Sequence, residues 1–194
     1  MTTYVAMGDS FTAGIDPTGP RWADELARSL GGHYVNLAVA GATSQQVEEE
    51  QLERALELCP DLVTLVCGAN DVLYSTRPDA DEYAERLSRM FARLRREQPD
   101  VMILTATYPD ITQFLELRPR SRSRVERGMS RFNAACRAVA RRHHVVLLES
   151  FDHPEATQRS TFAADGFHPS AEGHRAAARE FLRVLRKRLR PTAA

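Results

Sequence analysis

The chain alternates short apolar runs with longer stretches of helical periodicity, five times over. The apolar runs predict strands at residues 3–8, 33–38, 62–67, 101–106 and 145–149. The intervening and following stretches predict helices at residues 21–30, 44–58, 80–97, 124–143 and 171–190. Strands separated by helices favour a parallel sheet with helices on both faces and right-handed crossovers. We therefore expect an α/β fold, a three-layer α/β/α sandwich with a five-stranded parallel sheet.

The composition fits a single domain spanning residues 1–194. A chain of 194 residues with 43% hydrophobic and 27% charged residues is ordinary for a globular protein with a sizeable core. Its 26 basic and 26 acidic side chains give zero formal net charge, so no overall field favours nucleic acid or a membrane surface. No window approaches the roughly 20 apolar residues of a membrane span. The oligomeric state stays open.

The cysteines and the first residues predict a cytoplasmic protein. Cys59, Cys67 and Cys136 are an odd set without Cys-x-x-Cys spacing, which indicates neither a disulfide framework nor a zinc site. The chain runs directly into its first predicted strand, without the basic region and apolar stretch of a signal peptide. His168 and His174 lie six residues apart but lack further ligands, so we expect no metal.

Ser10 follows the first predicted strand directly, where parallel α/β folds expose their reactive groups. A serine hydroxyl is a poor nucleophile at neutral pH unless a base takes its proton and donors receive the oxyanion. Asp165 and His168 offer such a base near the other end of the chain. Their spacing lets a tight turn aim both side chains at one cleft, where the carboxylate fixes the imidazole tautomer.

Two further segments supply candidate oxyanion donors. Gly41 and Asn70 each follow an apolar run, so we expect both at the same edge of the sheet as Ser10. The nucleophile elbow of the α/β-hydrolases is absent, because that pattern requires Gly-x-Ser-x-Gly and Thr12 stands two residues after Ser10.

In order and context, these segments resemble the four blocks of the SGNH hydrolase superfamily, also called the GDSL esterases and lipases. The matching residues are Gly8-Asp9-Ser10, Gly41, Gly68-x-Asn70-Asp71 and Asp165-x-x-His168, with Phe11 in place of the leucine of the family name. The resemblance implies a flavodoxin-like strand order 2-1-3-4-5. It also implies Ser10 as nucleophile, His168 as base and Asp165 as its orienter. The implied oxyanion hole comprises the Ser10 and Gly41 backbone N–H groups with the Asn70 side chain.

The predicted function is hydrolysis of a small-molecule acyl ester through an acyl-enzyme, without a cofactor. A thioesterase, a carbohydrate acetylesterase or a lysophospholipase would use the same groups, and transfer to an acceptor other than water stays open. Two alternatives come from other classes. One is a metal-dependent phosphoesterase with Asp9, Asp71 and Asp165 as oxygen ligands. The other is a catalytically silent ligand-binding module.

Two long segments interrupt the alternation and are expected to shape the substrate site, residues 108–123 and 151–170. The first combines an apolar group with arginines at 118, 120, 122 and 124, which indicate either a basic rim or a solvated helix entrance. No long insertion or apolar lid is present, so we expect a shallow acyl site for short chains. The basic last helix is expected to pack on the sheet, with a membrane-surface or partner-binding helix as the alternative. The candidate substrate-binding residues are Asp9, Phe11, Tyr108, Phe114 and Phe167.

Overall fold

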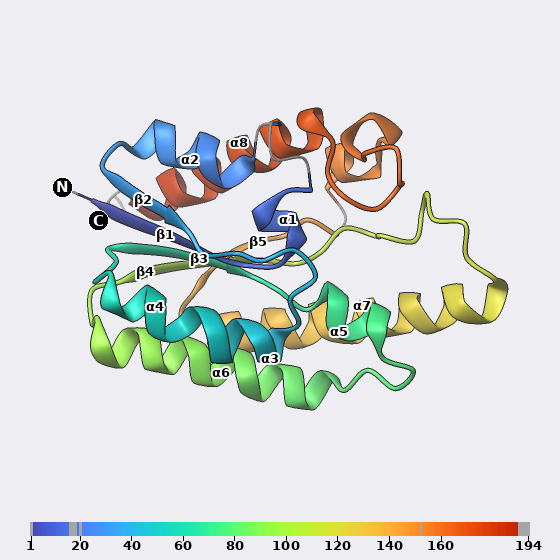
Figure 1. Cartoon of the computed structure of the whole chain (residues 1–194), viewed down its shortest axis with the longest axis horizontal. Helices are drawn as coiled ribbons and strands as arrows, with labels where there is room; N and C mark the ends of the chain where they lie inside the picture. The colour runs from blue at the N-terminus through green and yellow to red at the C-terminus, as the bar shows by residue number, and fades with distance from the viewer. Residues whose placement is uncertain (1, 16–18, 20, 152, 190–194) are drawn as a thin grey trace.

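The structure is a computed structural model that describes residues 2–15, 19, 21–151 and 153–189, and its five strands form one parallel sheet (Figure 1). Neighbouring strands follow the order β2-β1-β3-β4-β5, which confirms the predicted topology. The strands are β1 (Thr3–Gly8), β2 (His33–Asn36), β3 (Leu62–Val66), β4 (Met102–Ala106) and β5 (Val146–Leu148).

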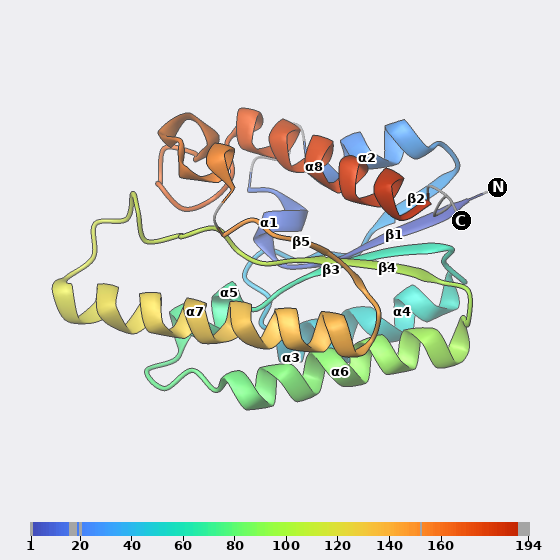
Figure 2. The same ribbon diagram turned by 180° about the vertical axis from the view of Figure 1, so that it is seen from behind.

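Helices cover both faces of the sheet (Figures 1 and 2). On one face α2 (Trp22–Leu30) packs beside α8 (Ala171–Leu189). On the other face lie α4 (Leu52–Glu57), α6 (Ala80–Glu97) and α7 (Pro119–Arg142). Every residue of β3 is buried, as expected for a parallel strand covered on both sides. The three predicted layers are thus confirmed.

The helix expected at residues 44–58 is not continuous, and that prediction is wrong in its middle. The chain forms α3 (Ser44–Gln46), then a π-helix over Val47–Gln51, and then α4. Gln51 at the end of the π turn is buried. Its side chain accepts the Gly8 N–H at 2.8 Å and donates to the Gly8 carbonyl at 2.9 Å. A buried amide needs such partners, and the wide turn brings Gln51 opposite Gly8.

Most of the other boundaries agree with the prediction to within one residue, and two differ by more. β2 ends at Asn36 instead of residue 38, where the Asn36 side chain accepts the Ala38 N–H at 3.0 Å, although the Leu37 and Val39 N–H groups still bond the backbone of β1. α7 begins at Pro119 instead of residue 124, since proline is well suited to the first position of a helix. The last residue of the predicted final helix, Arg190, lies outside the described residues.

Two short helices that the periodicity did not predict begin at the carboxyl ends of strands. They are α1 (Ser10–Ala13) after β1 and α5 (Ala69–Tyr74) after β3. Two 3₁₀ turns, Pro154–Thr157 and Arg159–Thr161, lie in the segment that follows β5. No helix among the described residues is long and apolar enough to cross a membrane.

Candidate active site

The candidate nucleophile, Ser10, is the first residue of α1 and sits at the carboxyl end of β1. Asp9 caps this helix, because its Oδ1 accepts the Phe11 N–H at 3.0 Å. Gly8 has a φ of +145°, and a Cβ atom there would collide with the Val66 carbonyl oxygen. Glycine therefore lets β1 bend into α1 while staying close to β3.

In the predicted triad, His168 lies within hydrogen-bonding distance of both Ser10 and Asp165. Ser10 Oγ lies 3.0 Å from His168 Nε2, and His168 Nδ1 lies 2.6 Å from Asp165 Oδ2. The His168 side chain retains 19% of its exposure, which leaves a path for a small substrate. In this arrangement the imidazole can accept the serine proton at Nε2 while Asp165 holds a proton on Nδ1.

The turn that carries Asp165 and His168 is held by its own hydrogen bonds. Asp165 Oδ1 accepts the backbone N–H groups of Phe167 at 2.9 Å and of His168 at 3.0 Å. The Ala163 N–H donates to the His168 carbonyl at 2.7 Å. Burial by itself would raise the pKa of Asp165, but the bonds from His168 and from the two backbone N–H groups outweigh it, and the pKa is lowered. Asp165 is therefore ionised at neutral pH, as an orienting carboxylate must be.

Gly41 and Asn70, the other predicted oxyanion donors, adjoin each other beside the nucleophile turn. The Val39 N–H donates to the Gly8 carbonyl at 3.1 Å, which joins the Gly41 loop to this turn. Asn70 Nδ2 donates to the Ala42 carbonyl at 3.0 Å. A side-chain amide has two N–H donors, so this bond orients Asn70 and leaves its second donor available. Gly41 has a φ of +84°, a conformation that favours glycine.

Asp71 anchors the helix that carries Asn70. Its carboxylate accepts the Ser44 backbone N–H at 2.8 Å and the Ser44 hydroxyl at 2.5 Å, and Arg86 lies 3.9 Å away. Burial raises the pKa of Asp71 even though both bonds from Ser44 favour the ionised form. The contact fixes the start of α5 against α3.

A buried carboxyl and phenol pair lies next to the nucleophile turn. Asp9 Oδ2 accepts the Tyr108 hydroxyl at 2.5 Å. The Tyr108 backbone is held in turn by the Asn133 side chain, which accepts its N–H at 2.9 Å and donates to its carbonyl at 3.0 Å. Asp9 and Tyr108, both candidate substrate contacts, are buried and pair with each other, and Tyr108 also lines an apolar cavity described below.

Sequence reasoning missed Gln51 and Asn133, which hold the backbone around the site. Both are buried amides on helices whose other buried residues are mostly apolar. A single polar residue on the apolar face of a helical pattern is the signal that could have found them, since a buried amide must be hydrogen-bonded.

Aromatic rings surround the imidazole of His168. The Phe11 ring lies 4.9 Å from the Tyr108 ring and 5.2 Å from the Phe167 ring, both edge to face. The Phe167 ring lies 4.4 Å from the imidazole, measured between centroids. Such edge-to-face packing restricts the orientation of His168. The structure thus brings Phe11 and Phe167 together beside the predicted base.

The segment before α7 packs on other loops. The Phe114 ring lies 5.1 Å from the Phe162 ring, and the Phe114 backbone packs against Gly166, within the turn that carries Asp165 and His168. Arg122 donates to the Leu115 carbonyl at 2.7 Å, and Arg124 donates to a backbone carbonyl of α5, also at 2.7 Å. These two arginines therefore tie loop backbone together at the entrance of α7.

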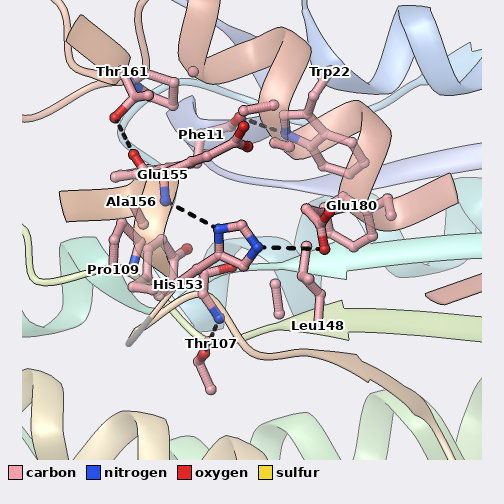
Figure 3. A pocket seen from close by; sticks show the side chains of 18 of the residues that line it. Phe11, Trp22, Thr107, Pro109, Leu148, His153, Glu155, Ala156, Thr161 and Glu180 are labelled. Carbon is pink, nitrogen blue, oxygen red and sulfur yellow. Dashed lines mark hydrogen bonds and ion pairs between the residues drawn. The ribbon is translucent and has the colours of Figure 1, made fainter. Parts of the chain in front are cut away.

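An apolar cavity of about 120 Å³ lies between α8 and the carboxyl ends of the central strands (Figure 3). Phe11 and Pro169, the sequence neighbours of Ser10 and His168, form part of its wall, although the triad itself does not. Figure 3 shows the His153 imidazole inside, 3.5 Å from the Glu180 carboxylate. Other residues that line the cavity include Trp22, Tyr108, Leu148, Phe162, Ala177 and Phe181.

A second, polar cavity of about 330 Å³ adjoins Asn70. Tyr74 lines it and is 70% exposed. The Tyr74 hydroxyl lies 3.6 Å from the position that a Cβ atom would take on Gly41. The charged residues of this cavity are Asp71, Arg77, Asp79, Glu82 and Arg86.

The aspartates of the phosphoesterase alternative do not form a ligand set. Asp9 pairs with Tyr108, Asp71 with Ser44 and Asp165 with His168. Across the described part of the chain, no group of three or more His, Cys, Asp or Glu side chains could hold a metal ion.

The parallel sheet has the strand order expected of the SGNH hydrolases, and Ser10, His168 and Asp165 come together beside it. The family model for the GDSL-like lipase/acylhydrolase family matches residues 6–176. The chain belongs to this family and is a carboxylic ester hydrolase.

Solved structures show the same fold. A lipase/acylhydrolase from Enterococcus faecalis is 22% identical with a TM-score of 0.77, and the match covers 100% of both chains. A member of the lipolytic G-D-S-L family from Veillonella parvula is 20% identical with a TM-score of 0.76, over 96% of this chain and 100% of that one. An acetylxylan esterase from Geobacillus stearothermophilus, solved as a catalytic mutant, is 21% identical with a TM-score of 0.75, over 95% and 94%. None of the curated proteins matches the chain.

Proposed function

We propose that the protein hydrolyses small acyl esters through an acyl-enzyme formed on Ser10. The observation that carries this proposal is the 3.0 Å separation between Ser10 Oγ and His168 Nε2, because a serine hydroxyl needs an adjacent base to become a nucleophile. Asp165 orients that base. The oxyanion hole comprises the backbone N–H groups of Ser10 and Gly41 with the Asn70 amide.

In the first half-reaction Ser10 Oγ attacks the acyl carbon while His168 Nε2 takes the serine proton. The negative charge that develops on the carbonyl oxygen is stabilised by the N–H groups of Ser10 and Gly41 and by the second donor of Asn70. His168 then gives its proton to the leaving alkoxide as the ester C–O bond breaks. In the second half-reaction His168 takes a proton from water, which attacks the acyl carbon. The bond between that carbon and Ser10 Oγ then breaks, His168 returns its proton to Oγ, and the carboxylic acid leaves.

Labelling with a fluorophosphonate probe, followed by mass mapping of the labelled peptide, tests this mechanism. We expect the label on Ser10 in the wild-type protein and no label in Ser10→Ala. Ser29→Ala, which removes an exposed hydroxyl on α2, is the matched control and should be labelled like the wild type. A label on another residue, or full turnover of p-nitrophenyl acetate by Ser10→Ala, would contradict the proposal.

The apolar cavity supports a short acyl chain as the favoured group. A dry apolar cavity of ~150 Å³ holds a benzene molecule, so the 120 Å³ here suits a chain of about four to six carbons. Each methylene that enters gains about 0.8 kcal/mol, or about fourfold in kcat/KM, while methylenes beyond the cavity gain nothing. Ala177→Phe narrows this cavity and should lower kcat/KM for hexanoyl esters more than for acetyl esters.

A second candidate function, deacetylation of a polar alcohol such as a sugar, is supported by the polar cavity beside Asn70. Its wall carries charges of both signs, for example Asp79 and Arg77, which suits a neutral polyhydroxyl group better than an anion. Comparison of kcat/KM for an acetylated monosaccharide and for ethyl acetate tests it. Tyr74→Ala should lower the first about tenfold and the second less than twofold. Equal losses on both esters would argue against a sugar site.

A cytoplasmic location is also part of the proposal. It is supported by three free thiols, of which Cys59 is exposed while Cys67 and Cys136 are buried. Burial raises the pKa of Cys67 and of Cys136, which keeps both thiols neutral and unreactive.

A further inference from the structure

The nucleophile turn contains a buried ionisable pair that the proposed reaction does not use. The Asp9 side chain is fully buried, and each of its two carboxylate oxygens accepts one hydrogen bond. Its Oδ1 accepts the Phe11 N–H at 3.0 Å, and its Oδ2 accepts the Tyr108 hydroxyl at 2.5 Å. Both oxygens act as acceptors, and an O–H···O distance this short is typical of a charge-assisted bond to a carboxylate.

We propose that Asp9 and Tyr108 are positioning residues, and that the ionised Asp9 carboxylate, held by the Tyr108 hydroxyl, fixes the turn that presents Ser10. This inference rests on the proposed role of Ser10 as nucleophile. Asp9 directly precedes Ser10, and its carboxylate accepts the N–H of Phe11, which directly follows Ser10. The position of the Asp9 carboxylate therefore sets the direction of both the Ser10 hydroxyl and the Ser10 N–H. The Asn133 side chain binds both the backbone N–H and the backbone carbonyl of Tyr108, which fixes the position from which the phenol reaches Asp9.

The surroundings of Asp9 place its ionisation within the working pH range. Burial raises the pKa of Asp9 to about 7, against the bonds from Tyr108 and Phe11, and the negative charge of Asp71 raises it further. The Cys67 thiol beyond β3 is neutral, because burial raises its pKa. Removing the Tyr108 hydroxyl takes away the donor that favours the carboxylate, so the protonated form persists to higher pH.

His168 is the titratable group that faces this turn from the loop after β5. Its imidazole lies 6.0 Å from the Phe11 ring, measured between centroids. Loss of the proton on His168 and loss of the proton on Asp9 both raise activity with pH under this proposal. A variant that shifts the pKa of Asp9 alone therefore separates the contribution of Asp9 to the pH profile from that of His168.

Tyr108→Phe is the decisive variant, and Tyr4→Phe is its matched control. Tyr4 is also buried, and its hydroxyl lies 2.8 Å from Thr64 Oγ1 in the sheet interior. For Tyr108→Phe we expect the acid limb of the kcat profile to move up by about one pH unit, so that kcat falls about fivefold at pH 7 and recovers to within twofold at pH 9. KM should stay within twofold. Tyr4→Phe should leave both the limb and kcat unchanged.

Asp9→Asn supplies an independent arm, because the amide has the shape of the carboxyl but cannot ionise. We expect kcat to fall at least tenfold even at pH 9, with KM within twofold. Asp9→Asn should still unfold in a single cooperative urea transition, which shows that the variant is folded in the assay. The proposal is overturned if the acid limb of the kcat profile of Tyr108→Phe coincides with that of the wild type. It is also overturned if Asp9→Asn keeps the kcat of the wild type. Fluorophosphonate labelling of Ser10 at pH 9 should survive in Tyr108→Phe, whereas it would be missing from the wild type if the proposed nucleophile were wrong.

Discussion

Replacing Asn70 with alanine should separate the catalytic and the structural contribution of one side chain. The two N–H donors of its amide have different tasks, since one binds the Ala42 carbonyl at 3.0 Å and the other is left for the oxyanion. Loss of one oxyanion donor costs about 2.7–4 kcal/mol in the barrier, so we expect kcat to fall by about 10² to 10³. Loss of the bond to Ala42 costs about 0.5–1.5 kcal/mol of folding free energy. For a chain of this size that loss lowers Tm by about 1–6 °C.

The assay is steady-state hydrolysis of p-nitrophenyl acetate, with urea denaturation of the same preparations. Thr105→Ala is the matched control, because Thr105 is also buried and its hydroxyl donates to a backbone carbonyl, that of Leu65 at 2.7 Å. It should lose a similar amount of stability and keep its kcat. A kcat for Asn70→Ala within threefold of the wild type, or a change confined to KM, would refute the assignment of Asn70 to the oxyanion hole.

Activity should rise from pH 5 to 9 as Asp9 ionises, because burial raises the pKa of Asp9 to about 7 and its carboxylate holds the turn that presents Ser10; initial rates across this range check it. EDTA should have no effect; loss of activity that a divalent ion restores would favour the phosphoesterase alternative. Acetyl to hexanoyl p-nitrophenyl esters should exceed dodecanoyl esters in kcat/KM, and a steady increase out to palmitoyl would refute the short acyl site. Stability should fall in acid through His174, whose pKa burial lowers to about 4. Because the unfolded chain binds this proton below pH ~6.5, the stabilisation present at pH 7 drops by about 2 kcal/mol at pH 5. His174→Asn, whose side-chain oxygen can still accept the Trp22 N–H, should remove that drop in urea unfolding measured at both values.

The layers of the fold were predictable because the period of the apolar residues shows which face of each helix or strand is buried. In a parallel sheet, the residues that follow different strands then lie at the same carboxyl edge. Ser10 and His168 are 158 positions apart, yet local turn and strand signals near each of them were enough to predict their meeting. The partner of Asp9 was not predictable in this way. Tyr108 lies 99 positions away, and nothing in its local pattern distinguishes a phenol aimed at a carboxyl from one that faces substrate. The single domain and the substrate contacts stay predictions.

The π turn at Val47–Gln51 contains one residue more than an α-helix would use to cover the same rise. An α-helix advances about 100° per residue, so a deletion within this turn would rotate α3 by that angle relative to α4. The shortened helix could then keep only one of two contacts. If Gln51 stayed bonded to Gly8, Ser44 would rotate away from Asp71, and if Ser44 stayed bonded to Asp71, Gln51 would rotate away from Gly8. Many loops tolerate a change of one residue, but here the number of residues in the π turn lets Gln51 bond Gly8 while Ser44 bonds Asp71. Single-residue deletions scanned along residues 44–58 should therefore be most damaging within 47–51 and milder near the exposed Glu57 at the end of α4.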